Sequence, residues 1–149
     1  MHLPSYPVIN IARDYSEYKF VSTGIHGAIP KVVVFDLMFA GENIYNVALL
    51  DILKDGTSDT NVSNNGDMRE ILATVTKIII DYTNAYPERK IFFTGSDIEG
   101  KRNSVYNRAI REFYSDLNDY FTIEGYIDAE NKEPFNSLNR YVAFLVKRK

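Results

Sequence analysis

Residues 31–51 read KVVVFDLMFAGENIYNVALLD, and this stretch decides the fold class. Residues 31–40 are apolar on both alternating faces, which is typical of a strand in the middle of a sheet. The Gly-Glu-Asn sequence at 41–43 makes a tight connection to a second strand-like run at 44–51. The stretch therefore predicts an antiparallel hairpin.

A long amphipathic helix is predicted over 67–85. Its apolar residues recur three and four positions apart and so fall on one face; they are Met68, Ile71, Leu72, Val75, Ile78, Ile79 and Tyr82. Asp67 followed by Glu70 resembles a capping box at its start, and Pro87 ends it.

The remaining elements are assigned by the same periodicities. A second helix is predicted at about 101–118, and further strands at 15–22, 90–94, 121–127 and 141–146. The order βββαβαββ predicts an α+β fold with two helices and a mixed, mostly antiparallel sheet of five to six strands. The same order occurs in the ribonuclease H-like fold, so that topology is an alternative.

Length and composition favour one domain over 1–149, because 149 residues can bury a substantial core. Pro4 and Pro7 predict that residues 1–12 form an extended arm. With no Cys, the chain has no disulfide, thiolate ligand or Cys nucleophile. We see no membrane-spanning run and no signal peptide, and expect a cytoplasmic protein.

A turn and helix start at 94–111, with the sequence TGSDIEGKRNSVYNRAIR, is the preferred candidate site. Amides at a helix start attract anions, and residues 101–111 carry four positive charges and no acid. The expected ligand is nucleic acid or another phosphate-bearing molecule, without a cofactor or resident metal. The residues assigned to it are Thr94, Gly95, Ser96, Lys101, Arg102, Arg108 and Arg111.

That surface has a structural alternative, in which Ser96 or Asp97 only caps the helix and the arginines form a solvated face. It is not a P-loop, because Arg102 stands where that motif has Ser or Thr. The last ten residues, 140–149, add four basic residues and no acid. Such charge patterning permits contact with an acidic partner.

An enzymatic alternative uses Asp36, Glu70 and Asp97 as a divalent-metal site of a nuclease or phosphohydrolase. Asp36 is the single charge in VVVFDLMF, and a carboxylate in a central strand is costly unless it is paired or used. That residue falls in the second predicted strand, whereas the ribonuclease H-like fold places it in the first. Asp36 can equally point to solvent or pair with an arginine.

Other polar features have structural explanations. The segment SNNGD at 63–67 favours a turn and a helix cap, with a polar ligand as the alternative. Residues 23–30, with two glycines and a proline, are predicted to form a turn, which places His26 at the surface. A third functional hypothesis is a protein-interaction module or homodimer, formed through an exposed strand edge or a tyrosine-rich face. The tyrosines expected on that face are Tyr6, Tyr15, Tyr18 and Tyr45.

Several segments taken in order carry a family resemblance; they include Asp14–Tyr15, Ile44–Asn46, Ser63–Asp67, Ile71–Val75, Phe92–Ser96, Arg102–Tyr106 and Phe144–Lys149. The chain resembles a family of small bacterial proteins classed as a domain of unknown function, over nearly its whole length. The resemblance implies a single bacterial domain and carries no activity. Its recurring segments coincide with the 63–67 loop and the 94–111 turn and helix, which raises interest in both.

Overall fold

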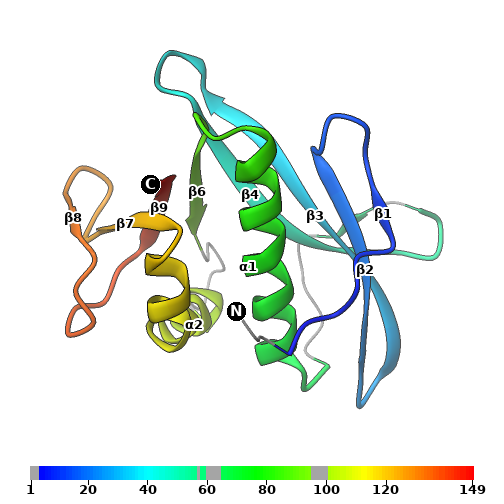
Figure 1. The fold of residues 1–149 in the computed structure, drawn as a ribbon. Helices are drawn as coiled ribbons and strands as arrows, with labels where there is room; N and C mark the ends of the chain where they lie inside the picture. Colours follow the sequence, from blue (N-terminus) through cyan, green and yellow to red (C-terminus); the bar gives the residue numbers. More distant parts are fainter. Residues whose placement is uncertain (1–3, 57, 60–64, 95–100) are drawn as a thin grey trace. The chain divides into compact units, whose positions relative to one another are not determined.

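The computed structural model shows an α+β chain (Figure 1). It describes residues 4–56, 58–59, 65–94 and 101–149, with the backbone alone described at 58–59, 101–106, 108 and 109. The helices are α1 (Met68–Ala85), α2 (Lys101–Asn118) and a short 3-10 helix, η1 (Ala40–Glu42). The strands are β1 (Asn10–Ile11), β2 (Glu17–Gly24), β3 (Gly27–Phe39), β4 (Ile44–Ile52), β5 (Ser58–Asp59), β6 (Lys90–Thr94), β7 (Phe121–Tyr126), β8 (Lys132–Pro134) and β9 (Ala143–Arg148).

Hydrogen bonds order the strands β1-β2-β3-β4-β6-β9-β7-β8, and β5 pairs with β4 outside this path. The β4–β6 pair is parallel, whereas β1–β2, β2–β3, β6–β9, β7–β9 and β7–β8 are antiparallel. The prediction of a mixed, mostly antiparallel sheet with two long helices is therefore confirmed.

The predicted number of strands, five to six, is too low. The additional strands β1, β5 and β8 span two or three residues each, which is too short for a hydrophobic period to show in the sequence. The turn predicted over 23–30 is also too long. Residues 27–30 already belong to β3, and Gly24 pairs with Gly27 across a two-residue turn. The ribonuclease H-like topology stays a hypothesis.

Two compact units are distinguished within the chain, and each is described by itself. The first comprises the residues up to Asp36 together with Val47–Ala85, and the second comprises Leu37–Asn46 and Tyr86–Lys149. The single domain predicted over 1–149 therefore stays a prediction.

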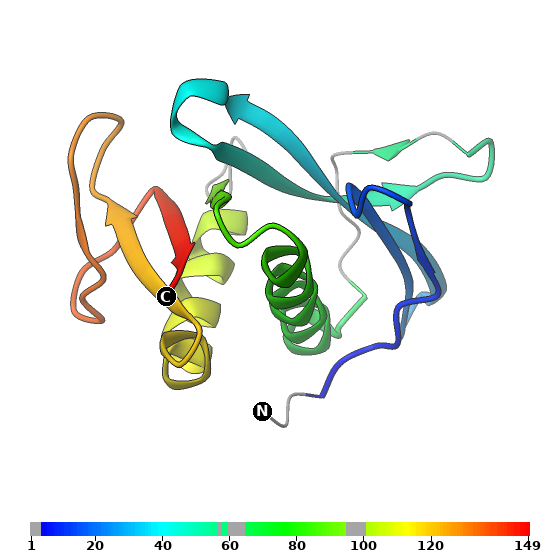
Figure 2. The same ribbon diagram turned by 45° about the horizontal axis from the view of Figure 1, so that its top comes forward.

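In the first unit, α1 lies on one face of β2 and β3 (Figures 1 and 2). Alternation along β2 turns Tyr18, Phe20 and Ser22 inward, as a half-buried strand requires. Phe35 of β3 stacks on Tyr82 of α1 with ring centroids 3.8 Å apart. The apolar face predicted for α1 is the face that is buried; its buried apolar residues are Ile71, Leu72, Ala73, Ile78, Ile79 and Tyr82.

Residues 6–11, within the region predicted to form an extended arm, are attached to this unit. The backbone N–H of Tyr6 donates to Thr74 Oγ1 at 2.8 Å, which fixes the arm to α1. Further along, Ile9 N–H donates to the Lys19 carbonyl at 2.9 Å, and β1 then pairs with β2. Because its backbone groups are bonded at both ends, residues 6–11 form part of the folded unit.

In the second unit, β9 is the central strand, with β6 on one side and β7 on the other. It is apolar on both faces, as predicted, and its first four residues, Ala143–Val146, are all buried. The side chains of α2 that complete this core are Ile110, Phe113 and Leu117. Burial of each large apolar side chain contributes about 1.5–3 kcal/mol.

Candidate functional site

Residues 139–142, which precede β9, are held by three side chains of β6 and α2. Thr94 Oγ1 donates to the Val142 carbonyl at 2.7 Å. The buried Asn107 side chain makes a pair of bonds with Tyr141, donating from Nδ2 to its carbonyl at 2.7 Å and accepting its N–H at 2.9 Å. Arg111 Nη2 donates to the Asn139 carbonyl at 3.1 Å. These bonds fix the segment that leads into the central strand.

Two of the residues predicted to bind an anion, Thr94 and Arg111, therefore bind backbone carbonyls of this chain. Gly95 and Ser96 lie outside the described residues, and so do the side chains of Lys101, Arg102 and Arg108. The structure shows that the basic helix 101–118 is joined through Arg111 to the segment where the basic tail begins.

The tail contributes further cations, one of which lies beside aromatic rings. Arg140 and Lys147 are exposed, and Arg148 is half-buried with its guanidinium 5.3 Å from the Tyr120 ring centroid and 5.6 Å from that of Phe121. Arginine over an aromatic face is held in place without losing its charge. Both acid-free stretches singled out in the sequence thus belong to the second unit.

The carboxylates proposed for a metal site are not brought together by any described contact. Asp36 is exposed near the end of β3, and Glu70 is half-buried in the first turn of α1. Asp97 lies outside the described residues. Among the residues that the structure describes, no group of three His, Asp or Glu side chains could hold a metal ion.

The start of α1 carries a buried polar cluster. The carbonyl of Asp67 accepts the Ile71 N–H at 3.0 Å, so Asp67 is the N-cap residue, as predicted. Its Oδ2 accepts hydrogen bonds of 2.5 Å from the hydroxyls of both Tyr6 and Ser22, and its buried Oδ1 has no partner among the described residues. The capping box expected with Glu70 is therefore not formed, because β2 and the N-terminal arm use the carboxylate.

Asn65, two residues earlier, binds the turn between β2 and β3. Its Oδ1 accepts the His26 N–H at 2.6 Å, its Nδ2 donates to the Gly27 carbonyl at 2.9 Å, and its own carbonyl accepts the Ile25 N–H at 3.1 Å. The cap predicted within the 63–67 segment is thus Asp67, whereas Asn65 binds a turn elsewhere in the chain, and residues 63 and 64 lie outside the described residues. His26 is exposed in the turn, as predicted.

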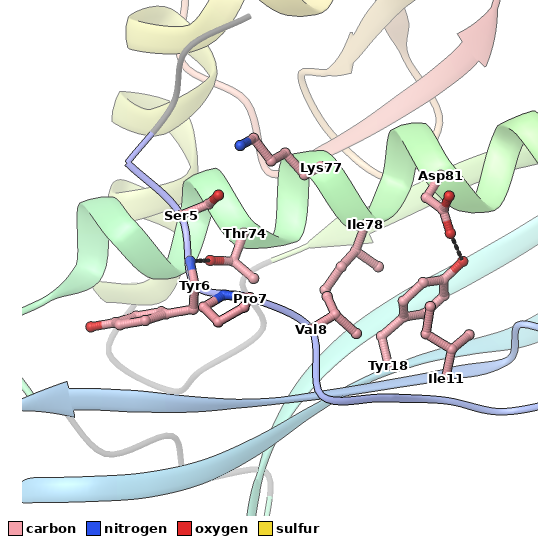
Figure 3. A pocket seen from close by; sticks show the side chains of 10 residues that line it. All are labelled: Ser5, Tyr6, Pro7, Val8, Ile11, Tyr18, Thr74, Lys77, Ile78 and Asp81. Atoms are coloured by element: carbon pink, nitrogen blue, oxygen red, sulfur yellow. Dashed lines mark hydrogen bonds between the residues drawn. The ribbon is translucent and has the colours of Figure 1, made fainter.

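A groove of about 390 Å³ runs along α1 in the first unit (Figure 3). One wall is α1, and the other is the N-terminal arm with Tyr18 of β2. Tyr18 is 1% exposed, so the prediction that it lies on a surface face is wrong. Its hydroxyl donates to Asp81 Oδ2 at 2.7 Å. Burial of the ring, together with this bond, raises the pKa of Tyr18 above its usual value, so the phenol remains a donor.

The comparisons with known proteins give one family and no activity. A family model described as a family of unknown function (DUF6934) matches residues 2–149. The chain belongs to this family. No curated protein and no solved structure gives a significant match to the chain. Within the described part of this DUF6934 member, no helix has the length and apolar character needed to span a membrane.

The sequence did not predict two interactions within this DUF6934 protein, that of Asn107 with Tyr141 and that of Tyr18 with Asp81. Asn107 gives no signal, because a single polar residue in a helix is expected to face solvent unless the segment that it binds is known. Tyr18 lies in an aromatic-rich segment and Asp81 on the predicted helix 67–85, but their pairing joins positions 63 residues apart. The one available signal was the spacing of Lys77 and Asp81, which places opposite charges four residues apart on one helix face.

Proposed function

We infer that the second unit binds an anionic polymer, with nucleic acid as the preferred ligand. The observation that supports this is the bond from Arg111 to the Asn139 carbonyl, which ties the acid-free basic stretch 101–111 to the residue directly before the second such stretch, 140–149. A guanidinium that is exposed and already anchored loses little side-chain entropy when it meets a phosphate. The family match assigns no activity to this surface.

The net charge of the chain limits where a nucleic acid can bind. The net charge is −3, so a nucleic acid is repelled overall and must be bound by a local patch. Binding of this kind depends on a small number of phosphate contacts, and its affinity falls steeply with salt. Arg140 and Lys147 extend the patch beyond the helix and are exposed.

The test is a salt titration of fluorescently labelled single-stranded RNA and duplex DNA binding to the full chain. In Lys101→Ala/Arg102→Ala and in Arg108→Ala/Arg111→Ala, we expect weaker binding and a salt slope reduced by about one for each phosphate that is no longer neutralised. Lys19→Ala/Lys54→Ala removes the same charge from exposed positions of the first unit and serves as the matched control.

Two results would contradict this function. One is the absence of detectable binding at low salt. The other is an affinity that falls equally in the control and in both test variants, since this would indicate a response to net charge alone.

A protein-interaction function is the second candidate, because the end of the β3–β4 hairpin is apolar and exposed. Leu37, Met38 and Phe39 are 55%, 39% and 52% exposed in succession. Pairing through strand edges is less favoured, because the end strands β1 and β8 span only two and three residues. Light scattering of the chain and of Phe39→Ser tests self-association: a concentrated monomer rules out a stable homodimer.

A further inference from the structure

The groove along α1 carries two opposite charges that do not pair with each other. Lys77 and Asp81 are both exposed on α1 and line the groove four residues apart, a spacing at which such side chains commonly form an ion pair. No ion pair of Lys77 is formed with the residues that the structure describes. In Figure 3 the lysine side chain extends toward Ser5 and away from Asp81.

The carboxylate is fixed in place, and the floor between the charges is apolar. The Tyr18 hydroxyl donates to Asp81 Oδ2, and no hydrogen bond from the described residues is made to the second oxygen of this exposed carboxylate. Between the two charged residues lies the buried Ile78, which faces Val8 of the N-terminal arm (Figure 3). The arm itself is attached to α1 through Tyr6, so the opposite wall of the groove is formed in the folded chain.

We propose that this groove is a binding site for a small zwitterion whose ammonium and carboxylate groups are separated by a short apolar body. The ammonium binds Asp81, the carboxylate binds Lys77, and the apolar body lies against Ile78 and Val8. The groove volume of about 390 Å³ suits a small molecule, since ligand pockets typically measure about 300–1,000 Å³.

The two charges favour a zwitterion over simpler ligands. A bare cation that approaches Asp81 is repelled by Lys77, and a bare anion that approaches Lys77 is repelled by Asp81. Side chains four residues apart on a helix have Cβ atoms about 5–6 Å apart, which sets the span that the ligand charges have to match. An α-amino acid has its charges too close together for this span, whereas an ω-amino acid with several methylene groups fits it.

The experiment is a titration of the ¹⁵N-labelled full chain with 6-aminohexanoate, hexylamine and hexanoate, followed by amide chemical shifts. We expect 6-aminohexanoate to shift amides of residues 5–11 and 74–81, and the two singly charged probes to bind about tenfold more weakly. Asp81→Asn keeps an acceptor for Tyr18 and removes the charge, and Lys77→Gln keeps the side-chain stem. Each should weaken 6-aminohexanoate about tenfold.

Asp119→Asn and Lys54→Gln remove equivalent exposed charges outside the groove and should leave binding unchanged. The proposal is overturned if 6-aminohexanoate produces no shifts in these segments at about 50 mM, which corresponds to negligible affinity. It is also overturned if hexylamine binds as tightly as 6-aminohexanoate, or if Asp81→Asn and Lys77→Gln bind the zwitterion like the unmodified chain.

Discussion

Gly125 in β7 lies directly beneath the ring of Tyr141. A Cβ at this position would lie 2.4 Å from Cγ and Cδ1 of that ring, closer than real contacts allow. The ring is fully buried and its hydroxyl is bonded to Glu133, so it cannot move aside freely. We expect Gly125→Ala to lower the free energy of unfolding by about 1–3 kcal/mol, as overpacking does in a filled core.

Urea denaturation of the two proteins measures this effect, and Gly41→Ala is the matched control. A Cβ at Gly41 has no heavy atom within 4 Å, so the same substitution should change stability by less than about 0.5 kcal/mol. Equal midpoints for Gly125→Ala and Gly41→Ala would contradict this expectation, because they would show that a methyl group fits beneath the Tyr141 ring.

Glu133 gives the same region a pH dependence. Its Oε1 accepts the Tyr141 hydroxyl at 2.7 Å and the Asn139 amide at 2.6 Å, and these bonds, that of Tyr141 first, lower the pKa of Glu133 below its usual 4.5. A carboxyl whose pKa is lower in the folded state stabilises the fold above the unfolded pKa, and this contribution disappears as the pH falls through the folded pKa.

We therefore expect Glu133→Gln to be less stable than the unmodified chain near neutral pH, with a gap that closes as the pH falls below the usual pKa of a glutamate. Urea midpoints measured across this range test the expectation. Glu17→Gln, at an exposed position on β2, controls for the loss of one negative charge. A gap for Glu133→Gln that stays constant from neutral to acid pH would mean that ionisation of Glu133 does not contribute to stability.

At the scale of elements, β3 and β4 are joined by a buried ion pair. Lys31 is fully buried and its ammonium binds the carboxylate of Asp51, which is itself 4% exposed. Removing one member leaves the other charge buried without its partner, which typically costs about 3–5 kcal/mol. Replacing both with apolar residues of similar volume is often neutral or stabilising.

We expect Asp51→Leu to lower the free energy of unfolding by several kcal/mol, in the range of about 3–5. The double variant Lys31→Met/Asp51→Leu should recover most of that loss, because no charge is then left buried. A denaturation-based double-mutant cycle measures the coupling. Additive effects of the two substitutions would show that the pair is solvated and that the charges act independently.

The pair also marks the limit of prediction from sequence. The period of 67–85 predicted α1 to within one residue, and the apolar run at 90–94 matches β6, because each pattern lies within one element. The sequence predicted a strand from Lys31, which lies within β3, but gave no indication that this lysine is buried, since its partner is 20 residues away. Strands β1, β5 and β8 were missed for a related reason: their pairing depends on neighbouring strands.

For the candidate sites, too, the sequence shows the residues but not their partners. Charge runs such as 101–111 are visible in sequence, and so is the N-cap position of Asp67. The partners of these residues are not, so the sequence could not show that Arg111 binds the Asn139 carbonyl, or that Tyr6 and Ser22 use the Asp67 carboxylate. Local patterns therefore identified these polar residues but did not predict which groups they bind.

At the scale of the whole molecule, the two compact units share two continuous strands. The backbone of β3 passes from the first unit to the second after Asp36, and that of β4 returns to the first unit at Val47. Unfolding either unit therefore removes ordered residues from a strand that also belongs to the other. From this continuity we expect one cooperative transition, and the single domain predicted for 149 residues stays a prediction that this transition would test.

Val33→Ala in the first unit and Phe144→Leu in the second test this cooperativity, because both side chains are fully buried. Each substitution should cost about 1–3 kcal/mol through reduced burial and the resulting cavity. If the chain unfolds as one unit, either variant lowers the hydrogen-exchange protection of amides in both β2 and β9 by the same free energy. If Val33→Ala lowers protection in β2 alone and Phe144→Leu in β9 alone, the two units open independently, and the single-domain prediction fails.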